Sequence, residues 1–240
     1  MKKISHLLGC TVFIFVFLIS GSALIAQSVT GNGNVVEKER NLSGFDKIES
    51  KYGVDVHIQL GSSNKVVVKT DENLQEHIKT EVEGSVLKIS SKGNIRKAKA
   101  FDVYVTLTDL KEISAHSGSD VYAESTLKLD KLNIEAHSGS DIHMELEVGT
   151  LTCLLNGGSD AFLKGSAGTM DIEANGGSDI SAKSLKAGDC KLDVSGGSDA
   201  RVYVTGKIEM KASGGSDIYY SGNPEVLSSR ASGSSDIHGN

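Results

Sequence analysis

Aspartate is the most regularly spaced chemical group in this chain. Seven glycine- and serine-rich phrases each end in one, at intervals of 18 to 21 residues: Asp120, Asp141, Asp160, Asp179, Asp199, Asp217 and Asp236. If these repeats stack, neighbouring carboxylates lie ~5 Å apart and repel by about 1 kcal/mol in water and about 3 kcal/mol at an effective dielectric of 20. Ca²⁺ would relieve the repulsion, but it needs six or more oxygen ligands, and one carboxylate per repeat supplies too few. We therefore predict that the aspartates cap turns, and we predict no metal site and no cofactor.

Two other residue combinations suggest chemistry. His116 and His137 occupy equivalent places in adjacent repeats, yet zinc needs at least a third protein ligand. Ser119, Asp120 and a histidine have the residue types of a catalytic triad. However, the phrase that contains Ser119 and Asp120 recurs seven times, whereas catalysis needs one distinct site. The repetition indicates architecture, so we predict a protein that is not an enzyme and assign no catalytic residue.

Planar side chains recur two residues after the aspartates. In this set Tyr122, His143, Phe162, Arg201 and Tyr219 are candidates for a surface-binding ladder. Alternation along a strand directs them outward, where they could stack on sugar rings or on a partner protein. The alternative is ordinary strand propensity, because aromatic residues favour strands wherever they point.

The elements that must position these residues are the coils of a β-solenoid. A period near 19 residues is too long for a helix or strand rhythm and is typical of one stacked repeat. Apolar residues alternate with polar ones on both sides of each phrase, as in Leu132, Ile134 and Ala136 before it and Ile142 and Met144 after it. A second turn signal, such as Val148-Gly149-Thr150, closes each repeat. The fold class predicted is all-β, a single-stranded β-helix of two short strands and two turns per coil.

Glycine inside the phrase predicts a left-handed backbone position. The turn residues are Gly118, Gly139, Gly158, Gly177, Gly197 and Gly215, each followed by Ser-Asp. We expect the serine and aspartate side chains to hydrogen-bond their own backbone amides.

Residues 27–110 lack the phrase but are rich in alternating segments, among them Val54 to Ile58 and Phe101 to Leu107. Glu83-Gly84-Ser85 predicts a hairpin turn, and Asp71 is expected to cap one or two helical turns reaching Ile78. This part is predicted to cap the N-terminal end of the solenoid. No comparable cap follows Asp236, so association of copies through the C-terminal coil around Ile237 is an open alternative.

Residues 1–26 have the pattern of a secretory signal peptide, with Lys2 and Lys3 before an apolar run and small residues before Gln27. Leu7-Leu8-Gly9-Cys10 resembles a lipoprotein box, but most of the apolar run follows the cysteine. Cleavage removes two lysines and lowers the formal net charge from −6 to −8; without a basic stripe, nucleic acid is not an expected partner. No membrane span is expected after cleavage. Cys153 and Cys190 lie about 10 Å apart, too far for a disulfide.

The expected organisation is a signal peptide (1–26), an N-terminal β-rich part (27–110) and the repeat solenoid (111–240), with 27–240 forming one continuous domain. These features resemble the autotransporter-adhesin head GIN domain family of bacterial envelope proteins. The resemblance runs through Gly31-Asn32-Gly33-Asn34, Asn41 to Ile48, Val54 to Ile58 and Lys69 to Leu74, and ends in the repeats. It implies an exported β-helix without catalytic residues; no long translocator region is seen, so a complete autotransporter is not expected.

The sequence therefore predicts an exported, non-enzymatic, adhesin-like binding or structural module of the bacterial cell envelope. It would act in the periplasm, on the outer surface or after secretion, and its partner would be a surface glycan or an envelope protein. Many weak contacts repeated along a rigid ladder would replace a deep pocket. The alternatives are a carbohydrate-active β-helix enzyme and a self-assembling envelope scaffold.

Overall fold

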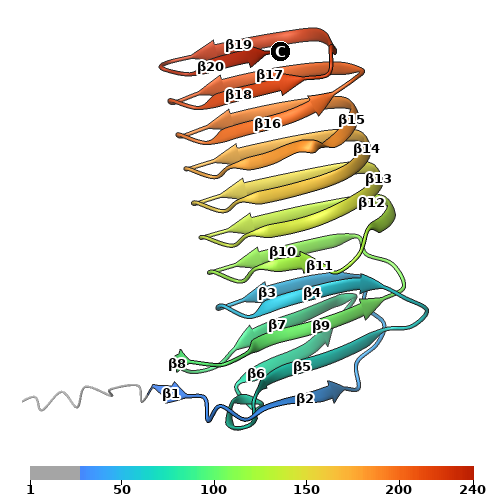
Figure 1. The fold of residues 1–240 in the computed structure, drawn as a ribbon, viewed down its shortest axis with the longest axis vertical. Coiled ribbons are helices and arrows are strands. Elements are labelled where there is room, and N and C mark those ends of the chain that lie inside the picture. The colour runs from blue at the N-terminus through green and yellow to red at the C-terminus, as the bar shows by residue number, and fades with distance from the viewer. Residues whose placement is uncertain (1–27) are drawn as a thin grey trace, which may run out of the picture.

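The computed structural model describes residues 28–240, and the predicted signal peptide lies outside the described residues. These residues form an all-β solenoid of stacked coils, with one short 3₁₀ helix, η1 (Glu72–Leu74) (Figure 1). The fold class predicted from the 19-residue period is confirmed. No helix among residues 28–240 is long and apolar enough to cross a bilayer.

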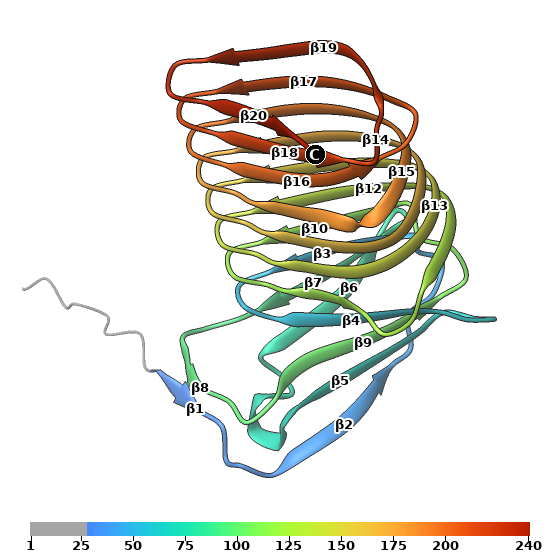
Figure 2. The same ribbon diagram turned by 45° about the horizontal axis from the view of Figure 1, so that its top comes forward.

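The regular coils are built from parallel strands that run around two faces of the solenoid (Figure 2). Their strands are β10 (Glu112–His116), β11 (Val121–Ala123), β12 (Leu127–His137), β13 (Ile142–Asn156), β14 (Ala161–Asn175), β15 (Ile180–Ser195), β16 (Asp199–Val204), β17 (Lys207–Ser213), β18 (Asp217–Ser221), β19 (Glu225–Ser232) and β20 (Asp236–Gly239).

Residues at equivalent positions of successive repeats lie directly over one another. Ile134 pairs with Cys153, Cys153 with Ile172, and Ile172 with Leu192. All four side chains are buried in one continuous apolar core, as the alternation predicts. Cys153 and Cys190 are buried free thiols, and burial raises the pKa of each to about 12.

The two edges of the coils differ from the predicted pair of turns. At the Gly-Ser-Asp edge the chain makes a tight turn with two successive left-handed residues, for example Gly157 (φ 66°) and Gly158 (φ 74°). At the opposite edge β13, β14 and β15 continue unbroken through Gly149, Gly168 and Gly188. Of the predicted second turns, only those at Gly206 and at Gly222 to Pro224 coincide with a break between strands, β16 to β17 and β18 to β19. In the other coils the predicted turn is wrong, because a smoothly bent strand keeps its hydrogen bonds to both neighbouring coils.

The N-terminal region contributes both coils and a cap. Its strands are β1 (Val29–Thr30), β2 (Val35–Arg40), β3 (Lys47–Lys51), β4 (Asp55–Leu60), β5 (Lys65–Asp71), β6 (Ile78–Glu83), β7 (Val86–Ser91), β8 (Ile95–Lys97) and β9 (Phe101–Leu107). β3 and β4 form a coil directly below β10 and β11, and β7 and β9 lie below that coil. The coils are thus stacked out of chain order, because β3 and β4 come before β7 and β9 in the sequence but lie above them.

The bottom of the stack is sealed by antiparallel strands. β5 pairs with β9 and β2 with β5, while β6 forms the predicted hairpin with β7. The predicted capping role of Asp71 is wrong: its buried carboxylate makes no cap bond to η1 and accepts hydrogen bonds from the amides of Gly33 and Lys99. Burial of this carboxylate raises its pKa, but hydrogen bonds from Lys99, Gly33 and two further backbone amides together outweigh burial and hold the pKa below its usual value.

Candidate functional site: the aspartate and ring columns

The repeated aspartates form one vertical column that holds the coils together. The backbone N–H of each upper aspartate donates to Oδ1 of the aspartate below, at 2.9 Å for Asp141 on Asp120 and 3.0 Å for Asp179 on Asp160. We call the full set the aspartate column; from bottom to top it contains Asp55, Asp120, Asp141, Asp160, Asp179, Asp199, Asp217 and Asp236. Asp55 was not recognised in the sequence, because the phrase Tyr52-Gly53-Val54-Asp55 lacks the serine.

A second column, made of the serines that precede the aspartates, is buried inside the turn edge. The amide of Ser140 donates to Oγ of Ser159 at 3.2 Å, and the amide of Ser159 donates to Oγ of Ser178 at 3.1 Å. These bonds run upward, whereas the aspartate bonds run downward. The expectation that both side chains bond their own amides is therefore corrected: they satisfy the turn amides of the adjacent coil, which the tight turn leaves without strand partners.

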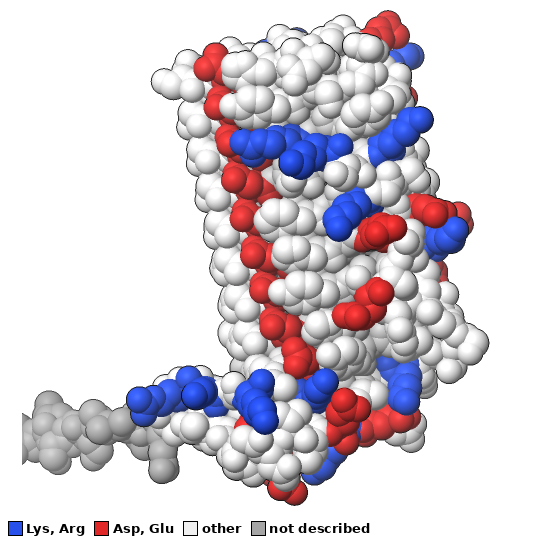
Figure 3. Space-filling view, viewed as in Figure 1, with Lys and Arg blue, Asp and Glu red and all other residues white. Residues whose placement is uncertain are grey.

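The aspartate column gives the solenoid a narrow acidic stripe along one edge, visible as the red column in Figure 3. Two of its members respond to this crowding. Burial, together with the charges of neighbouring carboxylates, raises the pKa of Asp55 and of Asp141 above the usual aspartate value. The stripe is thus an electrostatically costly surface, and its amide bonds offset part of that cost.

The planar residues two positions after the aspartates also form a column on the outer face. In stacking order this ring column is Tyr104, His57, Tyr122, His143, Phe162, Ser181, Arg201, Tyr219 and His238, and all of these side chains are planar except that of Ser181. Ring centroids lie 4.5 Å apart for Tyr104 and His57 and 4.7 Å for His143 and Phe162, with nearly parallel planes. Arg201 continues the stack, because its guanidinium carbon Cζ lies 5.0 Å from the ring centroid of Tyr219.

This geometry restricts how the predicted ladder can bind. Because neighbouring rings cover each other's faces, the column offers mainly ring rims and the adjoining carboxylates to a partner. Phe162 and Tyr219 are the most exposed apolar members, at 41% and 37%. The binding role of Tyr122, His143, Phe162, Arg201 and Tyr219 stays a prediction.

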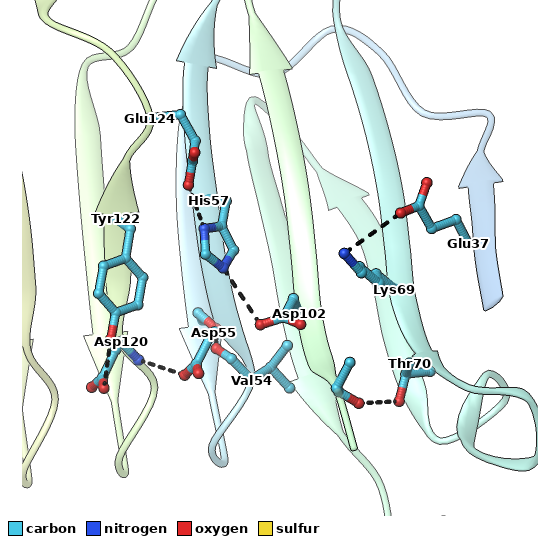
Figure 4. Close-up of polar contacts among 12 residues, drawn as sticks. Glu37, Val54, Asp55, His57, Lys69, Thr70, Asp102, Asp120, Tyr122 and Glu124 are labelled. Carbon is cyan, nitrogen blue, oxygen red and sulfur yellow. Dashed lines mark hydrogen bonds and ion pairs between the residues drawn. The ribbon is translucent and has the colours of Figure 1, made fainter. Parts of the chain in front are cut away.

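His57, a member of the ring column near the bottom of the stack, lies between the carboxylates of Glu124 and Asp102 (Figure 4). Its Nδ1 lies 2.6 Å from Oε1 of Glu124 and its Nε2 lies 3.4 Å from Oδ1 of Asp102, while Tyr104 and Tyr122 stack on its two faces. The hydrogen bond to Asp102 and then that to Glu124 raise the pKa of His57, against the effect of burial. Sequence reasoning missed His57 and Tyr104, although the alternation in both strands places them outward.

The other candidates for chemistry have structural surroundings. His116 and His137 stack at 4.9 Å, and Asn156 and Asn175 continue their column by hydrogen bonds. Ser119 is fully buried, and its Oγ accepts the amide of Val54 rather than facing solvent. One group, Asp217, Asp236 and His238, brings three potential metal-ligand atoms within 4.8 Å of one another on the surface.

The face opposite the ring column carries shallow grooves. One of about 400 Å³ lies toward the C-terminal end and is lined by, among others, Asp171, Asp189, Glu209, Lys191 and Lys207. Lys191 lies 3.9 Å from the carboxylate of Asp171. Sequence reasoning found no groove with clustered acids and bases, because these residues come from three different coils and no repeated phrase marks them.

Stacked coils, hydrogen-bonded turns and outward columns of side chains define a β-solenoid, and the comparisons identify its family. The family model "Putative auto-transporter adhesin, head GIN domain" matches residues 44–224, and the chain belongs to that family. The membership and the adhesin name favour a non-enzymatic protein. No curated protein matches the chain in sequence.

Solved structures of similar fold include proteins of Bacteroides and Parabacteroides species. A putative adhesin from Bacteroides fragilis has a TM-score of 0.81 at 20% identity, covering 89% of this chain and 100% of its own. A putative adhesin from Parabacteroides merdae has a TM-score of 0.72 at 22% identity, with 90% and 100% covered. A putative lipid binding protein from Parabacteroides distasonis has a TM-score of 0.73 at 20% identity, with 89% and 100% covered. At these identities the similarity establishes the shared fold alone.

Proposed function

We propose that this protein is an exported, non-enzymatic module of the bacterial envelope that binds an extended surface glycan along the aspartate and ring columns. The observation that carries the proposal is the aspartate column: eight carboxylates in register, one per coil, beside the rims of stacked rings. Carboxylates and ring rims that carry O–H or N–H groups are suited to the hydroxyl groups of sugars.

The regular spacing supports a polymeric rather than a small ligand. Successive coils repeat the same groups every ~4.8 Å, so a chain lying along the stripe meets an equivalent contact at each coil. Each contact is weak, and their combination on a rigid frame raises the apparent affinity. The adhesin name of the family and the adhesin names of the similar structures point in the same direction.

A pull-down on insoluble and immobilised bacterial polysaccharides tests the proposal with the chain from Gln27. In one variant Asp141, Asp160 and Asp179 are changed to Asn, which keeps the amide-accepting oxygen but removes the charge. In the matched control Asp171→Asn, Glu173→Gln and Asp193→Asn remove three charges from the opposite face. We expect the first variant to lose at least ~10-fold in binding, worth about 1.4 kcal/mol, and the control to bind normally. Equal binding by both variants contradicts the proposal, as does a failure of every polysaccharide to bind.

Location is a separate part of the proposal. Cell fractionation followed by protease treatment of intact cells distinguishes the outer surface from the periplasm. Recovery of the chain in the cytoplasmic fraction contradicts export. Protection from protease in intact cells excludes adhesion to other cells but leaves a periplasmic glycan as the partner.

A polysaccharide-degrading activity is the main competing function, and the groove of Asp171, Asp189 and Glu209 is where it would lie. The same polysaccharides are incubated with the protein and assayed for new reducing or unsaturated ends. Release of such ends, abolished by Asp171→Asn with Glu209→Gln, would replace the binding function with an enzymatic one.

Self-assembly is the second candidate, and the C-terminal end of the stack favours it. Among the described residues β19 pairs only with β17 and β20 only with β18, and Val226 and Leu227 of β19 are 44% and 50% exposed. An open strand edge with apolar side chains is a template for another copy. Light scattering should show concentration-dependent dimers that Val226→Lys with Leu227→Lys abolishes, while Tyr52→Lys, at a residue 60% exposed elsewhere, has no effect. A monomer at all concentrations contradicts this candidate.

A further inference from the structure

The ring column has one missing step. Ser181 lies in register between Phe162 below and Arg201 above, and its side chain is too short to touch either plane. Every adjacent pair of planar groups elsewhere in the column stacks, at separations of 4.5 to 5.3 Å. The column is therefore continuous except for one position, where a serine stands in place of a planar group.

The size of this gap corresponds to one planar group. Phe162 and Arg201 are two coils apart, which is about 9.6 Å at ~4.8 Å per coil. A ring at the level of Ser181 would lie about 4.8 Å from each neighbour, the separation that the rest of the column uses and that offset ring pairs prefer. The register between β14 and β15 shifts directly after Phe162, so the strand irregularity coincides with the gap.

The two planes that border the gap differ in chemistry. Below it is the ring of Phe162, which is 41% exposed. Above it is the guanidinium of Arg201, whose opposite side stacks on Tyr219 at 5.0 Å. A cation on one side and a neutral ring on the other select an aromatic group, because its π face attracts both.

A carboxylate oxygen beside the gap adds a polar requirement. In three other coils the aspartate uses Oδ2 to bind the tip of its own planar residue: Asp120 with Tyr122 at 3.4 Å, Asp199 with Arg201 at 3.3 Å and Asp217 with Tyr219 at 3.5 Å. Oδ1 of Asp179 accepts the amide of Asp199. Within residues 28–240 we find no hydrogen bond to its Oδ2, the atom that would receive a donor from the missing group.

We propose that the gap at Ser181 is a binding site for a planar aromatic group that carries an N–H or O–H on its rim, such as an indole or a phenol. The group inserts between Phe162 and Arg201 and donates to Oδ2 of Asp179, which completes the ring column. Its source is either a small aromatic molecule or a tryptophan or tyrosine side chain of a partner protein. The site lies within the columns proposed to bind glycan, but it rests on the stacking geometry alone, and its binding of an aromatic group is measured without any glycan.

The absence of tryptophan from the chain allows a direct test. The protein, from Gln27, is titrated with N-acetyltryptophanamide, whose indole is then the only one present, and binding is followed by indole fluorescence and by two-dimensional amide NMR. We expect shifts confined to the amides around Phe162, Ser181 and Arg201. N-acetylphenylalaninamide lacks the rim donor and should bind several-fold more weakly, and a cyclohexyl analogue should not bind. Shifts spread evenly along the ring column, or equal binding of all three probes, overturn the proposal.

Filling the gap provides the matched variant. Ser181→Tyr places a phenol at the proposed position, so it should abolish indole binding and raise Tm by about 3–6 °C through two new stacking contacts. Ser181→Ala leaves the gap open and should keep both binding and Tm. Ser181→His serves as a second filling variant if the tyrosine variant does not fold. Indole binding that survives both filling variants overturns the proposal.

Peptides separate the two sources of the aromatic group. A Gly-Ser peptide with one central tryptophan is compared with N-acetyltryptophanamide on the same protein. Binding at least ~10-fold tighter by the peptide indicates contacts beyond the indole and a protein partner. Equal affinity indicates a site for a small aromatic molecule. If neither binds, the site does not exist.

Discussion

The two edges of the solenoid are both lined with glycine, but for different physical reasons. At the turn edge, Gly177 has φ of +76° and a side chain there would meet no atom within 4 Å. At the bend edge, Gly168 has no left-handed backbone, yet a Cβ there would lie 2.5 Å from the carbonyl oxygen of Gly149 in the coil below. One edge therefore needs glycine for its backbone conformation, and the other needs it for close contact between backbones.

The comparison shows that a conspicuous motif is not always the most constrained one. The Gly-Ser-Asp phrase is repeated almost letter for letter, whereas the bend is marked only by a single glycine in each of three coils. The turn can relax into solvent, but the bend is held by strands above and below. We expect substitutions at the bend to cost more than substitutions at the turn.

The largest effect is expected from Gly168→Ala. The added methyl group collides with backbone that cannot move without separating two coils, so the free energy of unfolding should fall by about 3 kcal/mol. This corresponds to a decrease in Tm of roughly 6–12 °C in a thermal melt. Gly177→Ala is the matched substitution at the turn edge. It carries only the conformational penalty, about 1–2 kcal/mol, and an equal or larger loss at Gly177 would refute the comparison.

Removal of one serine from the buried column ranks second. Ser159→Ala deletes the oxygen that accepts the amide of Ser140 at 3.2 Å and leaves that buried N–H without its partner. An unsatisfied buried group of this kind costs about 1–3 kcal/mol, measured by denaturant unfolding. Ser181→Ala removes a hydroxyl from the outer face and is the control. A neutral Ser159→Ala would mean that the serine column does not stabilise the turn edge.

Substitution of one carboxylate in the aspartate column should change stability less, and it should stabilise the protein rather than destabilise it. Asp160→Asn keeps an oxygen that accepts the amide of Asp179 and removes repulsion from Asp141 and Asp179. We expect a gain of up to about 1 kcal/mol at pH 7 and low salt, which decreases as salt screens the repulsion. Asp160→Ala removes the acceptor as well and should lose stability. If the asparagine and alanine variants behave alike, the hydrogen bond contributes nothing.

The turn edge was the part of the fold that sequence reasoning could predict best. The spacing of the aspartates, the left-handed glycines and the alternating apolar residues each follow from local rules, and the registers of β12 to β15 confirm the columns. The hydrogen bonds from each aspartate amide to the aspartate below could not be predicted from the sequence. A side chain that can bond an amide of its own turn can equally well bond an amide in the turn of the adjacent coil. The choice depends on the distance between coils.

The position of β3 and β4 could not be predicted for a different reason. Their turn, Tyr52-Gly53, shares only glycine and the later Asp55 with the repeated phrase. After β4 the chain leaves this end of the stack, builds the cap and the strands β7 and β9 below β3 and β4, and returns above them at β10. A linear repeat predicts the order of neighbours only while the chain does not leave the stack. The two lowest members of the ring column, His57 and Tyr104, were missed as a consequence.

The pH dependence of stability should be the smallest effect and should differ between the columns and the N-terminal cap. The pKa of His57 is raised by its bonds to Asp102 and Glu124, so its contribution is fully present below about pH 6.5 and is lost as pH rises through the higher pKa of the folded state. The raised pKa values of Asp55 and Asp141 likewise favour the folded state as pH falls toward them.

In the cap, the lowered pKa of Asp71 gives stability above about pH 3.8 that is lost in stronger acid. Tm should therefore rise as pH is lowered from 8 toward the raised pKa values of the two aspartates, and it should fall as pH drops below about 3.8. His57→Gln should remove the part of the rise above about pH 6.5, and an unchanged profile in that variant would show that the bonds of His57 to Asp102 and Glu124 do not stabilise the fold.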